Sequence, residues 1–123
     1  MPRRATSIGR AGEYYVCYAL ERAGLEATRS DGLFDIVAVR PDGRIISVEV
    51  KTCLTPRGAS VGFRIGNSSA DWFAFCIDRG HGPEVIFRRG EDPLFKQKFI
   101  RVKTADFTPA VFTKTLRELS TSV

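Results

Sequence analysis

Residues 34–53, which read "FDIVAVRPDGRIISVEVKTC", decide the fold. Two runs rich in strand-forming residues flank Pro41, Asp42 and Gly43. Proline, aspartate and glycine in this order are typical of a type I turn closed by a left-handed glycine, the usual three-residue loop of an antiparallel hairpin. The stretch therefore predicts a β-hairpin. Its first run is apolar on both faces, which favours an interior position in a sheet.

The length of this loop sets the register of the hairpin. If the loop spans residues 41–43, counting outward from it places Asp35 opposite Glu49. Opposed residues in an antiparallel pair share a face, with Cβ atoms about 4.5–5.5 Å apart. Lys51 follows Glu49 by two residues, so its side chain points to the same face. A two-residue loop would shift the pairing by one residue and remove this arrangement.

The opposed acids and the nearby amine predict a metal site. Like charges at this distance destabilise a sheet, and a divalent cation between them turns the repulsion into coordination. Mg²⁺ commonly takes one or two carboxylates together with waters and substrate phosphates. A lysine beside it can orient or deprotonate a water, or hold charge near the phosphate. The alternative is that Asp35 only begins a strand while Glu49 and Lys51 lie on a solvated face.

The N-terminal half of the chain predicts a helix followed by strands. The pattern indicates a helix over 7–23, which is capped by Ser7 and ends before Gly24, after a flexible arm over 1–6. Residues 25–30 predict a short edge strand ahead of the hairpin. The Gly-, Ser- and Pro-rich segment 53–70 predicts a long loop with one short strand near 61–65.

The C-terminal half predicts further strands and a closing helix. The apolar run 71–78, "DWFAFCID", is typical of a central strand covered on both faces, and its aromatic residues are expected in the core. Two more strands are expected over 83–89 and 98–102. Thr108 caps a helix whose apolar stripe is Phe112, Leu116 and Leu119. One domain over 1–123, of the α/β class with a mixed sheet and helices packed on it, is therefore expected.

Composition narrows the functional classes. The 123-residue chain has a net charge of +5, which favours a polyanionic partner. Three cysteines without paired spacing, and a single histidine in a turn, argue against a zinc site and against a catalytic triad. No apolar run is long enough to cross a bilayer and no signal peptide follows the first residues. A cytoplasmic protein with no membrane partner is expected.

The motif "FD" at 34–35 followed by "EVK" at 49–51 resembles the PD-(D/E)xK nuclease superfamily, which includes restriction enzymes and Holliday-junction resolvases. Phe34 stands where the family usually has proline. The segment "GRAGEYYVCYALERAGLEATRS", residues 9–30, looks like the first helix of the resolvase-like branch. The resemblance covers residues 7–78. It implies a restriction-endonuclease-like core, with a mixed central β-sheet flanked by helices.

The resemblance also implies an activity and a set of roles. It implies an endonuclease that hydrolyses branched or duplex DNA, including Holliday junctions, with Mg²⁺, for which Mn²⁺ substitutes, and that works as a homodimer. Asp35, Glu49 and the Val50 carbonyl would bind the metal, Glu13 would be an outer or second-metal ligand, and Lys51 would act on the attacking water. One alternative is an inactive nucleic-acid-binding module of the same fold, and another is an unrelated small α/β protein such as a scaffold or interaction domain. For Glu13 the alternative is a solvated helix residue.

Five residues are candidate nucleic-acid contacts. Arg10 lies one helical turn before the helix acid, and Arg29 and Ser30 should lie at the rim of the metal-site strand. Arg57 and Arg64 belong to the glycine-rich segment after the "EVK" strand. Arginine guanidinium groups and small hydroxyls commonly contact phosphates. An ordinary surface charge is the alternative for Arg10, and a plain loop is the alternative for Arg29 and Ser30.

Overall fold

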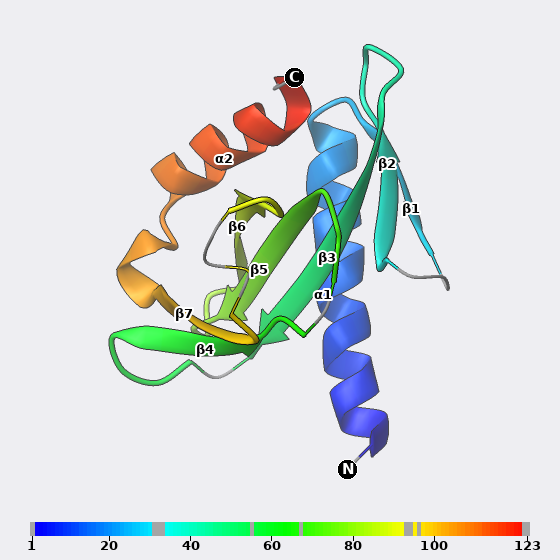
Figure 1. Cartoon of the computed structure of the whole chain (residues 1–123). Helices are drawn as coiled ribbons and strands as arrows, with labels where there is room; N and C mark the ends of the chain where they lie inside the picture. The colour runs from blue at the N-terminus through cyan, green and yellow to red at the C-terminus, as the bar shows by residue number, and fades with distance from the viewer. Residues whose placement is uncertain are drawn as a thin grey trace.

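A computed structural model describes residues 2–30, 34–54, 56–66, 68–92, 95 and 97–121, and residues 2–6 by their backbone alone. The elements, in chain order, are α1 (Pro2–Arg22), β1 (Glu26–Arg29), β2 (Ile36–Val39), β3 (Ile45–Cys53), β4 (Ser60–Arg64), β5 (Trp72–Asp78), β6 (Pro83–Arg89), β7 (Phe99–Lys103), the 3₁₀ helix η2 (Thr104–Asp106) and α2 (Pro109–Thr121). Figure 1 shows how they are arranged.

The main sheet has five strands in the order β1-β2-β3-β5-β6. β3 and β5 run parallel, whereas the other neighbouring strands run antiparallel. The sheet is therefore mixed and helices pack on it, which confirms the expected α/β class. β1 lies at an edge and β5 lies in the interior, buried from Trp72 to Ile77, so both expectations for these strands are confirmed.

The loop of the β2–β3 hairpin has the expected length and the expected left-handed glycine. The Gly43 N–H donates to the Arg40 carbonyl at 2.9 Å, and the Arg40 N–H donates to the Arg44 carbonyl at 2.8 Å. Gly43 has a φ of 87°, in the left-handed region that glycine occupies without a steric penalty. The Asp42 side chain accepts a further bond from the Arg44 N–H at 2.9 Å. The chain thus turns over residues 41–43.

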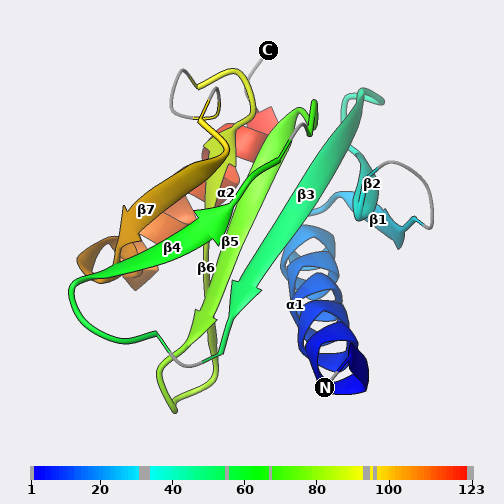
Figure 2. The ribbon, with the colours of Figure 1, turned by 60° about the horizontal axis from the view of Figure 1, so that its bottom comes forward.

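The two faces of the main sheet are covered by different layers. One face carries a hydrophobic cluster to which both helices contribute, α1 through Val16 and Leu20 and α2 through Leu119. The other face carries a second cluster beneath the two-stranded β4–β7 sheet. Figure 2 shows β4 and β7 side by side across the main sheet, with α1 on the opposite side of β3. The order of layers is helices, main sheet and small sheet.

The helices begin at different points relative to expectation. α1 begins at Pro2, so the expected start at Ser7 is wrong and residues 2–6, expected as an arm, belong to the helix. Proline is tolerated in the first helical turn, and arginine and alanine after it have high helix propensity. α2 begins as expected, because the Thr108 hydroxyl accepts a hydrogen bond from the Val111 N–H at 3.2 Å.

Candidate active site

The hairpin register brings Asp35 and Glu49 together. Ile36 pairs with Val48, and one further step in this register sets Asp35 opposite Glu49, in agreement with the hydrogen bond between their side chains. Hydrogen-bonded and non-hydrogen-bonded pairs alternate outward from the bonded pair at the loop, so these acids fall at a non-hydrogen-bonded position. Cα atoms there are only about 4.5 Å apart. The register expected from the sequence is therefore confirmed.

Asp35 is held in place by the backbone of the opposite strand. Its Oδ2 accepts a hydrogen bond from the Val50 N–H at 2.8 Å. β2 begins at Ile36, whereas β3 continues to Cys53 and pairs beyond Val48 with β5 on its other side. The carboxylate therefore takes the backbone donor that a longer β2 would use. The acid pair lies at the fork where the two strands separate.

Glu49 is a half-buried carboxyl with an altered pKa. Burial, and after it the hydrogen bond and negative charge of Asp35, together raise its pKa from the ordinary 4.5 to about 7. The Ser68 hydroxyl donates to Glu49 Oε1 at 3.0 Å, and this bond, together with the Lys51 charge, lowers the pKa. Such a pair holds a proton near neutral pH, or a cation in its place.

Lys51 shares the face of Glu49, as expected. In the parallel β3–β5 register, Glu49 pairs with Phe73 and Lys51 pairs with Phe75. Both phenylalanines belong to the cluster beneath the small sheet. The lysine is half-buried, and its charge acts on the Glu49 carboxyl. An acid pair and an amine thus converge beside the β4–β7 layer.

Glu13 lies elsewhere. Its carboxylate accepts a hydrogen bond from Arg29 Nε at 3.0 Å, and the Arg29 guanidinium also contacts Tyr14. Arg29 pairs with Ile36, which packs in the cluster beneath the helices, whereas Glu49 points to the opposite face. Within the described part of the chain, no three His, Cys, Asp or Glu side chains form a metal-binding group. The metal-ligand role of Glu13 stays a prediction.

The other candidate contacts lie at separate places. Ser30 adjoins the acid pair, because its N–H donates to the Asp35 carbonyl at 2.9 Å. Arg10 is exposed on α1, and Arg57 is exposed in the loop between β3 and β4. Arg64 is exposed at the end of β4. Ser30 is thus the one of these five that the structure places directly against the acid pair.

A basic surface that joins the candidate Arg64 to residues not expected from the sequence lies on the outer face of the small sheet. The register pairs Arg64 with Phe99 and Gly62 with Arg101, and all four residues are exposed. Phe99 is 52% exposed and its ring lies over Gly62, where a Cβ atom would collide with it. The Arg101 guanidinium lies 5.9 Å from the centre of that ring. We call Ser60, Gly62, Arg64, Phe99, Arg101 and Lys103 the outer face of β4–β7.

One signal in the sequence could have identified Phe99, Arg101 and Lys103 on this surface. The segment 99–103 alternates between exposed and buried positions, so Phe99, Arg101 and Lys103 were predictable as one face of a strand. Its partner strand was not predictable, because β4 and β7 are far apart in the sequence. Ser68 is the first of two adjacent serines before β5, and only the tertiary structure places its hydroxyl on Glu49.

The donor set of the fork fits a hard divalent cation. Two carboxylates and a backbone carbonyl are the oxygen ligands that Mg²⁺ and Mn²⁺ accept, with waters and substrate oxygens completing the shell. The pKa of Glu49 is raised first by burial and then by the hydrogen bond and negative charge of Asp35, and a bound cation would offset these effects. No protein-family model and no curated protein matches the chain. Among the described residues, no helix has the length and apolar character needed to span a bilayer.

Proposed function

We propose that this protein is a metal-dependent endonuclease of restriction-endonuclease-like fold that hydrolyses phosphodiester bonds in DNA. The observation that carries the proposal is the fork of the hairpin, where two carboxylates oppose each other and a lysine shares their face. Asp35 and Glu49, with the Val50 carbonyl, would hold Mg²⁺ or Mn²⁺. The bound metal supplies a Lewis acid, an activated water and a clamp on the phosphate.

The residues of the fork have separate tasks in this proposal. The Val50 N–H fixes the Asp35 carboxylate, and the Ser68 hydroxyl orients the Glu49 carboxylate. Lys51 orients the attacking water or accepts its proton. The water oxygen bonds to phosphorus as the bond from phosphorus to a bridging oxygen breaks. Fixed groups lower the barrier because little reorganisation is needed during the reaction.

The outer face of β4–β7 supports a nucleic-acid substrate. Its six residues carry three cations and no acid, and a half-exposed aromatic ring lies among them. Cationic grooves bind the phosphate backbone, and exposed aromatic rings stack on unpaired bases. The small sheet covers the same side of the main sheet to which Glu49 and Lys51 point. A DNA strand that extends from the acid pair can therefore continue onto the outer face of β4–β7.

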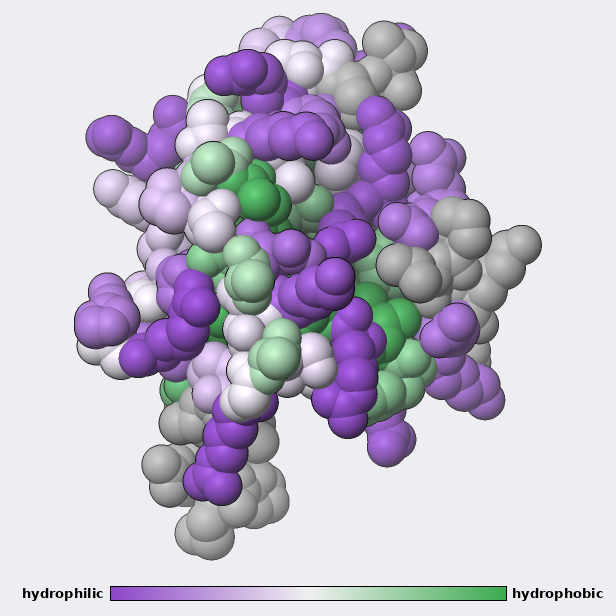
Figure 3. All heavy atoms as spheres, turned by 90° about the vertical axis from the view of Figure 1, so that its left-hand side faces the viewer, coloured by the Kyte–Doolittle hydropathy of each residue, from purple (hydrophilic) through white to green (hydrophobic). Residues whose placement is uncertain are grey.

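The homodimer is also a proposal. Figure 3 shows the side of the molecule on which α2 and the β4–β7 sheet lie in Figure 1, and hydrophilic side chains dominate it. Hydrophobic side chains form small separate groups there. A dimer that uses this side would have a largely polar interface, and light scattering measures its mass directly.

A cytoplasmic location agrees with the three free cysteines.

The test is a cleavage assay with linear, nicked, flapped and four-way DNA. The wild-type protein should cut at least one substrate with Mg²⁺ or Mn²⁺ and none with EDTA. Glu49→Gln and Lys51→Ala should lose cutting while they keep binding DNA. Glu26→Gln and Lys114→Ala, at exposed positions, are the matched controls. Cutting that persists in both site variants would overturn the proposal, and binding without any metal-dependent cutting would favour the inactive module.

A further inference from the structure

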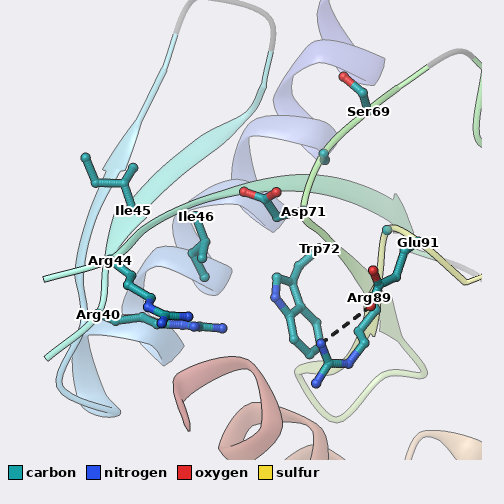
Figure 4. Close-up of a pocket in the computed structure, with 11 residues that line it drawn as sticks. Arg40, Arg44, Ile45, Ile46, Ser69, Asp71, Trp72, Arg89 and Glu91 are labelled. Carbon is teal, nitrogen blue, oxygen red and sulfur yellow. Dashed lines mark ion pairs between the residues drawn. The ribbon is translucent and has the colours of Figure 1, made fainter. Parts of the chain in front are cut away.

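A cleft of about 540 Å³ lies at the end of the main sheet where β3 and β5 begin. One wall is the loop end of the β2–β3 hairpin, and the other is the end of β6 with the residues after it. Figure 4 shows Arg40 and Arg44 from the first wall and Arg89 from the second, with Trp72 between them. Three guanidinium groups thus converge on one cavity.

Arg40 is the buried member of this group. It is only 6% exposed, and its Nε donates to the Leu119 carbonyl in the last turn of α2 at 2.9 Å. Among the residues that the structure describes, no carboxylate lies within ion-pair distance of it. The carbonyl end of a helix offsets only part of a charge. A buried cation is costly without a charged partner, so the site is incomplete as it stands.

Arg44 adds a second positive charge at the same wall. Arg44 lies opposite Arg40 next to the hairpin loop, where the Arg40 N–H donates to the Arg44 carbonyl. Figure 4 shows the Arg40 and Arg44 side chains both extending from the hairpin toward the cleft that they line. The ion pair between Arg44 and Asp42 is long, at 3.9 Å, and both side chains are more than half exposed. Like charges so placed repel each other, and an oxyanion between them would offset the repulsion.

The opposite wall presents Arg89 in a fixed plane. Its guanidinium lies over the Trp72 ring, 5.1 Å from the ring centre, and pairs at 3.7 Å with Glu91, which is 80% exposed. The remaining acid of the wall, Asp71, already accepts hydrogen bonds from the N–H and hydroxyl of Ser47. An exposed pair at this distance contributes little. Arg89 therefore keeps the capacity to bind an anion.

We propose that this cleft binds a phosphate group through Arg40, Arg44 and Arg89. Planar guanidinium groups donate paired, charge-assisted hydrogen bonds to phosphate oxygens, and the cavity has the size of a nucleotide-binding site. Its source is either a backbone phosphate of a nucleic acid or a free nucleotide. The loop before β5 links the cleft to the fork, because Ser68 contacts Glu49 and Ser69 lines the cleft. The proposal does not depend on metal binding or cleavage.

Titration calorimetry in EDTA tests this site with inorganic phosphate, a 5′-mononucleotide and a short DNA duplex. The Arg44→Gln/Arg89→Gln double variant removes two guanidinium groups outside the core and should weaken binding of the favoured ligand by at least about tenfold. Lys98→Gln/Lys114→Gln removes two charges at exposed positions that do not line the cleft, and it should bind phosphate and mononucleotide as the wild type does. Arg40→Lys keeps the charge but loses the planar fork, so its binding should also weaken.

The outcomes separate the two sources and the two proposals. Weaker binding of phosphate and mononucleotide in the double variant identifies a free ligand, whereas weaker binding of DNA alone identifies a backbone phosphate. Glu49→Gln should bind each ligand as the wild type does even though it fails to cut DNA. Absence of saturable binding by all three ligands, or a double variant within twofold of the wild type for each of them, would overturn the proposal.

Discussion

The backbone N–H of Val50 donates a hydrogen bond of 2.8 Å to the side-chain carboxylate of Asp35 across the end of the β2–β3 hairpin. A side chain thus occupies a position that backbone would fill if β2 were longer. The bond holds Asp35 against the strand from which Glu49 projects. The two acids therefore oppose each other because of the hairpin itself, and Asp35 contributes to the raised pKa of Glu49.

The raised pKa of Glu49 should make the stability of the folded protein depend on pH. The folded-state pKa of Glu49 is about 7, above its ordinary value of 4.5, so ionisation is less favourable in the folded protein. The folded state should therefore lose stability as pH rises from about 4.5 to 7. Glu49→Gln removes this loss and keeps an acceptor for Ser68. Thermal melts should show the variant gaining melting temperature relative to the wild type at pH 8 but not at pH 4.

The control for this experiment is Glu26→Gln, which changes one exposed acid on β1. Its difference from the wild type should change little between pH 5 and 8. If Glu49→Gln showed the same flat difference, the opposed pair would not exist in solution.

A divalent cation should offset the loss of stability that ionisation of Glu49 causes. In the proposed site Mg²⁺ would bind the ionised acids and displace the proton of Glu49, so binding should release protons and tighten as pH rises through about 7. Mg²⁺ should raise the melting temperature of the wild type more at pH 8 than at pH 5.5, and EDTA should cancel the increase. Equal stabilisation of Glu49→Gln by Mg²⁺ would place the cation elsewhere.

Ser68 should tune the reaction through Glu49. Its hydroxyl lowers the Glu49 pKa, so Ser68→Ala should raise that pKa and move the acidic limb of the pH–rate profile upward. Loss of one hydrogen bond to a charged group corresponds to about a tenfold effect on rate at pH 7. Ser69→Ala changes the neighbouring exposed hydroxyl and should leave the limb in place. A shift of equal size in both variants would indicate a loop effect.

The outer face of β4–β7 should contribute to DNA binding without metal. Phe99→Ala removes the exposed ring, and base stacking on a ring is worth about 1–3 kcal/mol, so single-stranded DNA should bind roughly tenfold more weakly. Arg101→Gln should weaken binding and reduce its salt dependence by about one phosphate contact. Fluorescence anisotropy in EDTA at several salt concentrations measures both effects.

The control for the ring is Tyr18→Ala, because Tyr18 is a 60% exposed aromatic residue on α1. Its affinity for DNA should match that of the wild type. If Phe99→Ala also binds as the wild type does, the outer face carries no substrate.

Two glycines of α1 should respond in opposite directions to alanine. A Cβ atom at Gly12 would collide with the Thr52 side chain on β3, whereas a Cβ atom at Gly9 meets nothing within 4 Å. Gly9→Ala should stabilise the protein by about 0.5–1 kcal/mol through helix propensity. Gly12→Ala should destabilise it, because α1 must move from β3. Urea unfolding measures both, and equal gains would show that the helix does not approach the strand.

The sequence by itself determined the hairpin and the pairing of Asp35 with Glu49. Three residues, Pro41, Asp42 and Gly43, specify the turn, and a turn of known length sets the register of the strands that it joins. The same local reasoning placed Lys51 on the face of Glu49. Strand alternation and helix capping are also local properties of the chain, which is why most elements were predictable.

Tertiary structure alone decided which distant residues meet. Ser68 on Glu49, Arg29 on Glu13 and the convergence of Arg40 with Arg89 each join segments whose sequence separation no local pattern spans. Such contacts depend on how layers pack, and packing follows from the total apolar area that each face buries. The sequence therefore determined what each strand presents, and the packing of its two faces decided which groups share a site.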